Sequence, residues 1–216
     1  MPSVTIQPTL GGYTGYTAGG ADQSAWDTAK DAATADALVT ADSSLLESSG
    51  WTNGSAMVCR RTFYTFQIPN NIKGIITSAT FKVGYLLYNG PVRIVAGQRT
   101  DFHVAITVED YDQVNFNTAY SDSAVTGTGG YYNIDLNQTG INFLNGEGVT
   151  GTYRELVFVS DYDYTDTVPT DSTGRALFQA RNSATYYPRL IINYYGISTR
   201  ISNGTTHIGT NAAIHI

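Results

Sequence analysis

Two stretches decide the fold of this chain: Arg60-Arg61-Thr62-Phe63-Tyr64-Thr65-Phe66-Gln67-Ile68-Pro69 and Ile75-Ile76-Thr77-Ser78-Ala79-Thr80-Phe81-Lys82-Val83-Gly84-Tyr85-Leu86-Leu87-Tyr88. The first is rich in the aromatic residues that favour β-strands, and the residues from Pro69 to Gly74 have the composition of a turn. The second alternates with a period of two, which is typical of a strand with one buried face. The alternation places on one face Ile75, Thr77, Ala79, Phe81, Val83, Tyr85 and Leu87. Together the two stretches predict a strand, a turn and a second strand.

Further runs of β-forming residues extend this pattern along the chain. Strands are predicted at residues 4–8, 102–108, 131–136, 155–160, 175–180 and 189–195. The segment 155–160 is almost continuously apolar, which indicates a central strand. The Ala-rich segment 28–41 is compatible with a short helix, although its residues 37–40 are β-like. Polar loops are predicted at residues 111–130 and 161–174, and connecting structure at 141–148.

About eight short strands separated by turns predict an all-β fold, a two-sheet antiparallel β-sandwich with a jelly-roll-like arrangement. Residues 1–195 form the predicted sandwich domain, since all-β domains of this length are common. Residues 196–216 hold few large apolar residues and contain the turn signal Ser202-Asn203-Gly204-Thr205. They are therefore predicted to form a C-terminal hairpin tail that packs on the domain or on a neighbouring subunit.

The composition agrees with a turn-rich β-protein. Charged residues make up only 14% of the 216 residues, while the chain has 22 glycines and 16 tyrosines. The net charge of −6 disfavours nucleic acid and anionic membranes as partners. The N-terminal residues do not resemble a secretory signal, and no apolar run is long enough to span a membrane. Either a signal has been removed, or the protein leaves the cell by another route, such as assembly into a virus particle and lysis.

The residue types used in catalysis do not form a recognisable constellation. Cys59, the single cysteine, lies in an apolar run and is predicted to be a small buried hydrophobic residue. A glycosidase would pair two carboxyl groups, and Glu109 and Glu155 are available, but Glu155 opens a buried strand. His207 and His215 could form a zinc pair within the tail or between chains. The protein is therefore predicted not to be an enzyme.

The placed strands resemble a known group of domains. Arg61-x-Phe63-x-x-Phe66-x-Ile68-Pro69 followed by Ile76-x-Ser78-Ala79-x-Phe81-x-Val83 resembles the signature of DNRLRE-type domains, which are related to a carbohydrate-binding-module family of β-sandwiches. The run 184–195 is similar to the last strand of that family, and Val4 to Pro8 to its first. The Trp26 region with Arg60-Arg61 resembles variants in phage structural and tail proteins. The resemblance covers roughly Val4 to Tyr195 and implies the fold more than the function.

The densest acidic cluster is a candidate calcium site. It consists of Asp161, Asp163 and Asp166, with Asp171 beyond. Calcium takes six to eight oxygen ligands, and an Asp-rich loop supplies several, although the spacing is not that of an EF-hand. A second acidic patch comprises Glu109, Asp110 and Asp112. The alternative is that both patches are solvated loop residues, and no cofactor other than calcium is predicted.

Aromatic residues in the predicted loops are candidates for a glycan platform or a protein interface. The main candidates are Tyr13, Tyr16, Trp26, Trp51, Tyr111 and Tyr162, with Tyr120 and Tyr131 as further ones. Flat rings stack on sugar rings, and tyrosine adds a polar group. The alternative is that these side chains pack on the sandwich.

Two hypotheses for the function follow. The first is a non-enzymatic virion structural protein: a phage capsid decoration, minor capsid or tail-associated subunit. Its partners are other copies of itself, capsid or tail proteins, and host-surface glycans. The second is a secreted, extracellular carbohydrate-binding module that accompanies a cell-surface protein or a glycosidase. Neither hypothesis includes nucleic acid binding or membrane insertion.

Overall fold

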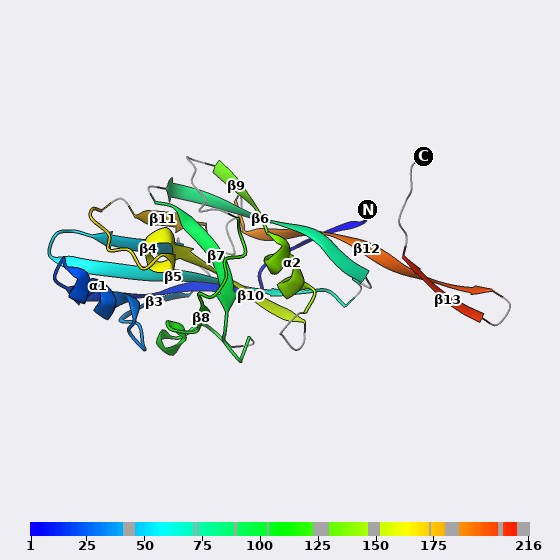
Figure 1. Ribbon diagram of the computed structural model, residues 1–216, viewed down its shortest axis with the longest axis horizontal. Coiled ribbons are helices and arrows are strands. Elements are labelled where there is room, and N and C mark those ends of the chain that lie inside the picture. Colours follow the sequence, from blue (N-terminus) through cyan, green and yellow to red (C-terminus); the bar gives the residue numbers. More distant parts are fainter. Residues whose placement is uncertain are drawn as a thin grey trace.

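Two antiparallel sheets pack against each other in the computed structural model, which confirms the predicted all-β sandwich (Figure 1). The structure describes residues 1–40, 46–70, 72, 74–88, 90–102, 104–122, 130–146, 152–172, 174–179, 186–202 and 205–210. The first sheet contains β1 (Ser3–Ile6), β12 (Arg189–Ser202), β6 (Gly74–Tyr88) and β9 (Gly130–Asp135). The second contains β3 (Ala37–Thr40), β2 (Leu10–Gly19), β5 (Ala56–Gln67), β10 (Tyr153–Ser160), β7 (Val92–Gly97) and β8 (Val114–Asn115).

Two further strands join the sheets at one corner. β4 (Leu46–Thr52) pairs with β5, β11 (Arg175–Phe178) pairs with β6, and β4 and β11 pair with each other. Glu47 on β4 is buried and accepts hydrogen bonds from Arg60 on β5 and Arg175 on β11. One carboxylate therefore connects β4, β5 and β11, the strands through which the second sheet is hydrogen-bonded to the first.

The two stretches that dominate the sequence lie in different sheets. β5 and β6 are both present as predicted, but β5 pairs with β2, β4 and β10, whereas β6 pairs with β12, β11 and β9. They meet across the core, where the ring of Phe81 lies 5.4 Å from that of Tyr64 and 5.6 Å from that of Phe66. The connection after Gln67 thus carries the chain across the sandwich instead of closing a hairpin.

The predicted alternation of β6 is wrong at its beginning. Ile75 is 58% exposed, while Ile76 is buried together with Ala79, Phe81 and Val83. The cause is a bulge: Ile76 pairs with Tyr194, but Ser78 pairs with Asn193, so β6 has one residue more than β12 at this point. An extra residue shifts the side-chain alternation by one position, which turns Ile75 outward.

The predicted strand at residues 102–108 is also wrong. The described residues here form irregular structure that leads into a short 3₁₀ helix, η1 (Val108–Asp110). The buried side chain of Arg99 supplies the donors that a neighbouring strand would have supplied. Its Nη2 donates to the carbonyl oxygens of Asp101, Val104 and Ala105, at 3.2, 2.9 and 3.4 Å. With these carbonyls satisfied by a side chain, the apolar run needs no sheet partner.

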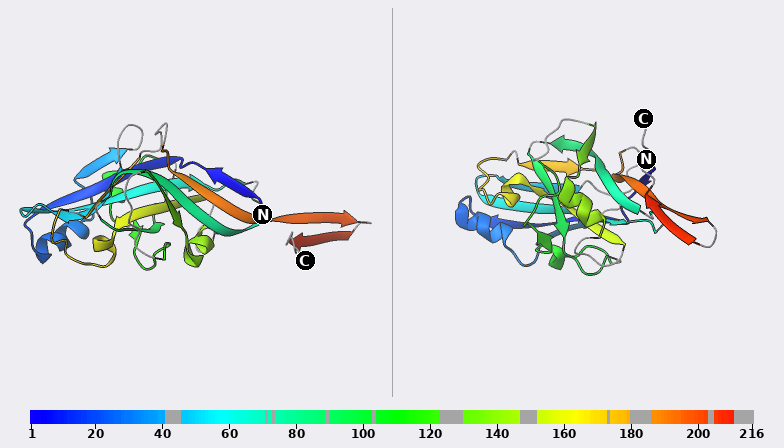
Figure 2. Two further views of the ribbon diagram at one scale, coloured as in Figure 1. Left: turned by 90° about the horizontal axis from the view of Figure 1, so that it is seen from above. Right: turned by 45° about the vertical axis from the view of Figure 1, so that its right-hand side comes forward.

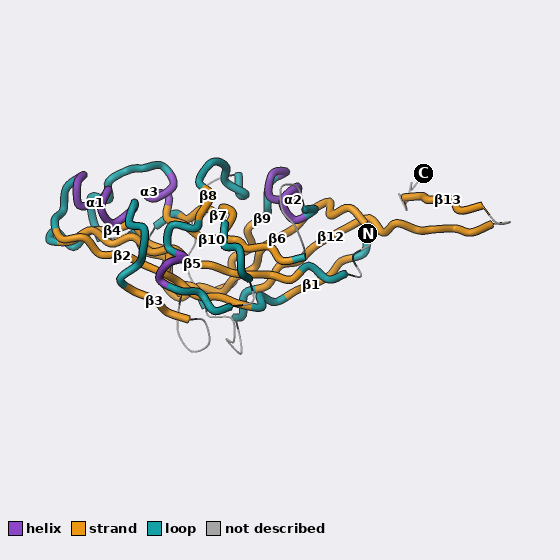
Figure 3. The backbone as a smooth tube through the Cα atoms, turned by 90° about the horizontal axis from the view of Figure 1, so that it is seen from below, coloured by secondary structure: helices purple, strands orange, loops and turns teal. Residues whose placement is uncertain are grey.

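Three helices lie on one side of the sheets (Figure 3). α1 (Gln23–Lys30) begins before the Ala-rich segment 28–41 and covers only its first residues. The β-like residues 37–40 of that segment form β3 (Ala37–Thr40). α2 (Gln138–Leu144) replaces most of the predicted connecting structure, because Asn137 caps it and three of its apolar residues are buried. α3 (Asp161–Tyr164) opens the predicted acidic loop.

The second half of β12 leaves the body of the molecule. β12 pairs with β6 as far as Gly196 and then with β13 (Thr205–Thr210), from Ile197 opposite Thr210 to Ser202 opposite Thr205. Figures 1 and 2 show this hairpin projecting from the sandwich. We call Ile197–Ser202 and Thr205–Thr210 the arm. No helix among the described residues is both long enough and apolar enough to cross a membrane.

Candidate functional site

The outer face of the second sheet is covered by α1, which creates a second, smaller core. Asp22 caps α1: its Oδ1 accepts a hydrogen bond from the Ala25 amide at 2.9 Å. Trp26 on α1 is fully buried against Met57 and Cys59 of β5. β5 is therefore buried on both faces, and the side chains on its outer face meet residues from loops far away in the sequence.

Arg61 is the centre of the polar contacts beneath α1. Its Nε and Nη2 donate to the two carboxylate oxygens of Asp163 at 2.8 and 2.9 Å, in a pair that is almost completely buried. Nη1 donates to the Tyr111 carbonyl and Nη2 to the Lys30 carbonyl, at 2.7 and 2.8 Å. The guanidinium also lies over the Tyr111 ring, 4.3 Å from its centroid. One side chain thus connects β5, α3, the end of α1 and the loop at Tyr111.

The ionisation of Arg61 is secured by its neighbours. Burial, the largest single effect, lowers the pKa of Arg61, but the Asp163 carboxylate, its hydrogen bonds and the nearby Tyr111 and Cys59 together raise the pKa above its ordinary value. Burial raises the pKa of Cys59, so this thiol stays protonated at neutral pH. The prediction that Cys59 is a small buried residue is confirmed.

The three aspartates of the predicted calcium site each face a different cation. Asp163 pairs with Arg61, Asp161 accepts from Arg93 Nε at 2.5 Å, and Asp166 lies 3.2 Å from Lys30 Nζ. Among the described residues, no group of three His, Cys, Asp or Glu side chains is placed to hold a metal ion.

The second acidic patch has structural partners. Asp110 accepts hydrogen bonds from the amide of Thr107 at the start of η1 and forms an ion pair with Arg99. Asp112 accepts from Gln113, and Glu109 is exposed. The side chains of His207 and His215, the predicted zinc pair, lie outside the described part of the chain.

Glu155 is enclosed by the fold. It accepts hydrogen bonds from Arg99 Nη1 at 2.9 Å and from Thr65 Oγ1 at 2.8 Å. A Cβ atom at Gly97 would lie 2.1 Å from its Oε2, so only glycine leaves room for this carboxylate. Burial raises the pKa of Glu155, although Arg99 and Thr65 lower it. This carboxylate is buried on the outer face of the second sheet, the face that also carries Val157 and Val159, and it does not line the pocket described below.

The six aromatic candidates do not share one surface. Trp26 and Tyr111 are fully buried. Tyr13 lies beside Arg60, Trp51 beside Arg175, and Tyr162 packs on the second core. Of the two further candidates, Tyr120 is buried, and the side chain of Tyr131 lies outside the described residues. Tyr16 lines a pocket.

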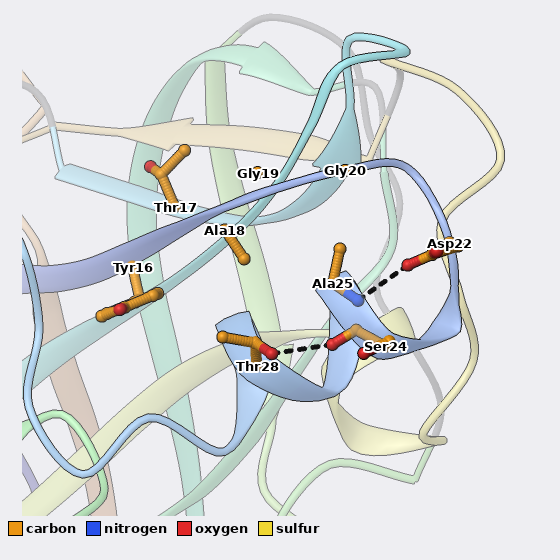
Figure 4. A pocket seen from close by; sticks show the side chains of 9 residues that line it. All are labelled: Tyr16, Thr17, Ala18, Gly19, Gly20, Asp22, Ser24, Ala25 and Thr28. Atoms are coloured by element: carbon orange, nitrogen blue, oxygen red, sulfur yellow. Dashed lines mark hydrogen bonds between the residues drawn. The ribbon is translucent and has the colours of Figure 1, made fainter.

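That pocket lies between the end of β2 and α1 and has a volume of about 360 Å³ (Figure 4). Its lining residues are Tyr16, Thr17, Ala18, Gly19, Gly20, Asp22, Ser24, Ala25 and Thr28. Figure 4 shows Ala18 and Ala25 facing each other at its centre, with Tyr16 and Thr28 toward one end and Asp22 toward the other. Gly20 has a φ of +109° and allows the turn into α1, where its amide donates to the Ser55 carbonyl at 2.9 Å.

Sequence reasoning found Tyr16 but missed the other groups of this pocket. Asp22, Ser24 and Thr28 stand in a segment with no motif, and they meet Tyr16 because α1 folds back on β2. Their only sequence signal is the Asp22 cap three residues before Ala25. No protein-family model matches this chain, and a comparison with curated proteins found no match either.

Proposed function

We propose that this protein is a non-enzymatic structural subunit of a virus particle, a capsid decoration, minor capsid or tail-associated subunit of a phage. It acts through contacts with other copies of itself and with capsid or tail proteins. The resemblance of its strand motifs to phage structural proteins supports a place in the virus particle. The projecting arm supports a role in contacts between subunits. The arm is the observation that carries the proposal.

Among the described residues, the arm joins the body through the backbone of β12. In the described part of the chain, β13 pairs with β12 alone, and Figures 1 and 3 show the hairpin lying clear of the sandwich. A two-stranded hairpin is marginally stable in water, and its outer edges present unpaired amides and carbonyls. A neighbouring subunit that packs on the arm or adds a strand to its edge supplies the missing contacts.

Exposed apolar side chains lie at the base of the arm. Ile75 is 58% exposed and is paired with Tyr195, immediately before β12 leaves the body. Met1 is 75% exposed and contacts Thr77 on the same strand as Ile75. Apolar burial is the main driving force of subunit association, so these exposed side chains beside the start of the arm support the proposal that a partner packs here.

Removal of the arm tests the proposal. A chain ending at Gly196 is expected to keep the melting transition of the sandwich but to lose self-association and binding to purified capsid or tail proteins, measured by mass photometry. Ile75→Ser is expected to weaken the same association. Leu38→Ser serves as the matched control, because Leu38 is also an exposed apolar strand residue, on β3 in the other sheet.

Two results would count against the proposal. One is a full-length protein that stays monomeric and binds none of the virion proteins. The other is an arm deletion that unfolds the sandwich, since the arm would then belong to the core of the domain.

A further inference from the structure

Arg60 and Arg175 share one buried carboxylate, that of Glu47. Arg60 donates from Nη1 to Oε2 of Glu47, and Arg175 donates from Nε to Oε1 at 3.0 Å and from Nη2 to Oε2 at 3.4 Å. Consecutive side chains of a strand point to opposite faces, so Arg60 lies on the face of β5 turned away from Arg61 and α1. Two guanidinium groups thus face a single carboxylate, and the three groups together carry one net positive charge.

An aromatic ring flanks each arginine. The guanidinium carbon of Arg60 lies 5.4 Å from the centroid of the Tyr13 ring. That of Arg175 lies 5.3 Å from the centroid of the Trp51 ring. These residues come from β2, β5, β4 and β11, which are hydrogen-bonded to one another in this order. We call this set the arginine cluster, and its members are Tyr13, Arg60, Glu47, Arg175 and Trp51.

The cluster has hydrogen-bond donors that its own residues do not use. Among the described residues, Arg60 forms no hydrogen bond through Nε or Nη2, and Arg175 forms none through Nη1. The two side chains are 23% and 34% exposed, so a partner can reach them from solvent. The Nε1 of Trp51 is buried and has no acceptor in the described part of the chain. Each of these unused groups donates, and none accepts.

These donors select the charge of a partner. Guanidinium and indole N–H groups only donate, so their complement is an acceptor. A carboxylate is the best match, because its two oxygens accept two parallel bonds from a planar guanidinium. The chain as a whole carries a net charge of −6, which disfavours long polyanions such as nucleic acid. One net positive charge is matched instead by an aspartate or glutamate side chain.

The residue types of the cluster favour a protein as the partner. Tryptophan, tyrosine and arginine carry much of the binding energy at protein interfaces. The rings of Tyr13 and Trp51 are half-buried, and they offer apolar area that a free phosphate or sulfate ion does not cover. Glu47 holds both guanidinium groups in place, which lowers the entropy lost when a partner binds.

We propose that the arginine cluster is the docking site for an acidic segment of a partner protein. An aspartate or glutamate carboxylate of the segment accepts hydrogen bonds from Arg60 and Arg175, and its apolar atoms pack on Tyr13 and Trp51. The cluster lies in the body of the molecule, where β4 and β11 join the two sheets. The inference therefore goes beyond the proposed function and does not depend on the arm.

Selection from a displayed library of short random peptides against the immobilised full chain tests the inference. The selected peptides should be enriched in aspartate and glutamate. The tightest of them should bind the full chain with a dissociation constant in the micromolar-to-millimolar range, measured by fluorescence anisotropy. Replacement of its acidic residues by asparagine and glutamine should weaken binding at least tenfold. A rise in NaCl from about 0.05 M to about 0.5 M should weaken it severalfold.

Two variants and a matched control locate the site. Arg60→Gln and Arg175→Gln should each reduce the affinity for the selected peptide at least tenfold. Arg93→Gln should leave it unchanged. Arg93 is also partly exposed, pairs with an aspartate and lies 4.8 Å from the centroid of a tyrosine ring, but there one carboxylate neutralises one guanidinium. Arg175→Gln keeps the pair of Arg60 and Glu47, so it remains informative if Arg60→Gln fails to fold.

The inference is overturned if the selection yields no binding peptide or no enrichment of acidic residues. It is also overturned if Arg175→Gln and Arg93→Gln have equal effects. Inorganic phosphate or sulfate that binds the cluster more tightly than the selected peptide would overturn it as well, since the cluster would then be a site for a free oxyanion.

Discussion

At the scale of single residues, Arg61 connects segments that lie far apart in the sequence. It stands in the strand motif that decides the fold, yet it does not face the central core. It lies on the outer face of β5, where three residues from three distant segments accept its hydrogen bonds, and one of them, Tyr111, also places its ring against the guanidinium. Removal of such a cation leaves Asp163 charged and buried, and an uncompensated buried charge is strongly unfavourable.

We therefore expect Arg61→Met to lower the free energy of unfolding by about 3–5 kcal/mol. The matched control is Arg93→Met. Arg93 also pairs with an aspartate of α3, but that pair is partly exposed, with side chains 21% and 27% accessible. Its loss should cost only about 1 kcal/mol or less. Urea denaturation measures both values, and equal losses for the two variants would contradict the role assigned to Arg61.

At the scale of elements, Arg99 and Glu155 determine the shape of the segment after β7. Arg99 binds the carbonyls of a run that its composition predicts to be a strand, and Glu155 on β10 holds Arg99 in place. Because burial raises the pKa of Glu155 above its ordinary value of 4.5, the folded protein binds this proton more tightly than the unfolded chain does. The stability due to this group is fully present below the ordinary pKa and is lost as the pH rises through the pKa of the folded state.

The expected result is a pH-dependent difference between the wild-type protein and Glu155→Gln, which does not titrate. The free energy of unfolding of the wild type, relative to that of the variant, should be smaller at neutral pH than at pH 4.5, the ordinary pKa of the group. Urea denaturation at both pH values measures this change. A relative stability that rises over this range would show that the ion pair with Arg99 dominates over burial.

At the scale of the whole molecule, β12 belongs to two environments. Its first half is hydrogen-bonded to β1 on one side and to β6 on the other, and its second half pairs with β13 in the arm. Stability follows packing, so the two halves of one strand should differ. In the free subunit, we expect the amides of Ile197–Ser202 to exchange with deuterium at least tenfold faster than those of Leu190–Asn193.

Hydrogen exchange with mass spectrometry resolves these two segments, and the first half of β12 serves as the internal control. In assembled particles, the protection of the arm should rise toward that of the body. Equal protection of both halves in a free monomer would mean that the arm is held by contacts within its own chain.

Much of the fold follows from local sequence patterns. The period-two alternation and the aromatic and β-branched composition place β5, β6, β9, β10, β11 and the first part of β12, because side-chain alternation is a property of the strand itself. Burial of Cys59 follows in the same way from the apolar run around it. The all-β class depends on these elements together.

The tertiary structure alone decides what these strands meet. Arg61 and Asp163 are 102 positions apart in the sequence. The pocket-lining residues of α1 lie near Tyr16 only because the helix folds onto β2. A bulge against β12 turns Ile75 outward, and Arg99 keeps the run after β7 from forming a strand. Local pattern reports how a segment prefers to fold, whereas ion pairs, bulges and pockets depend on which distant segment becomes its neighbour, and no local pattern encodes that choice.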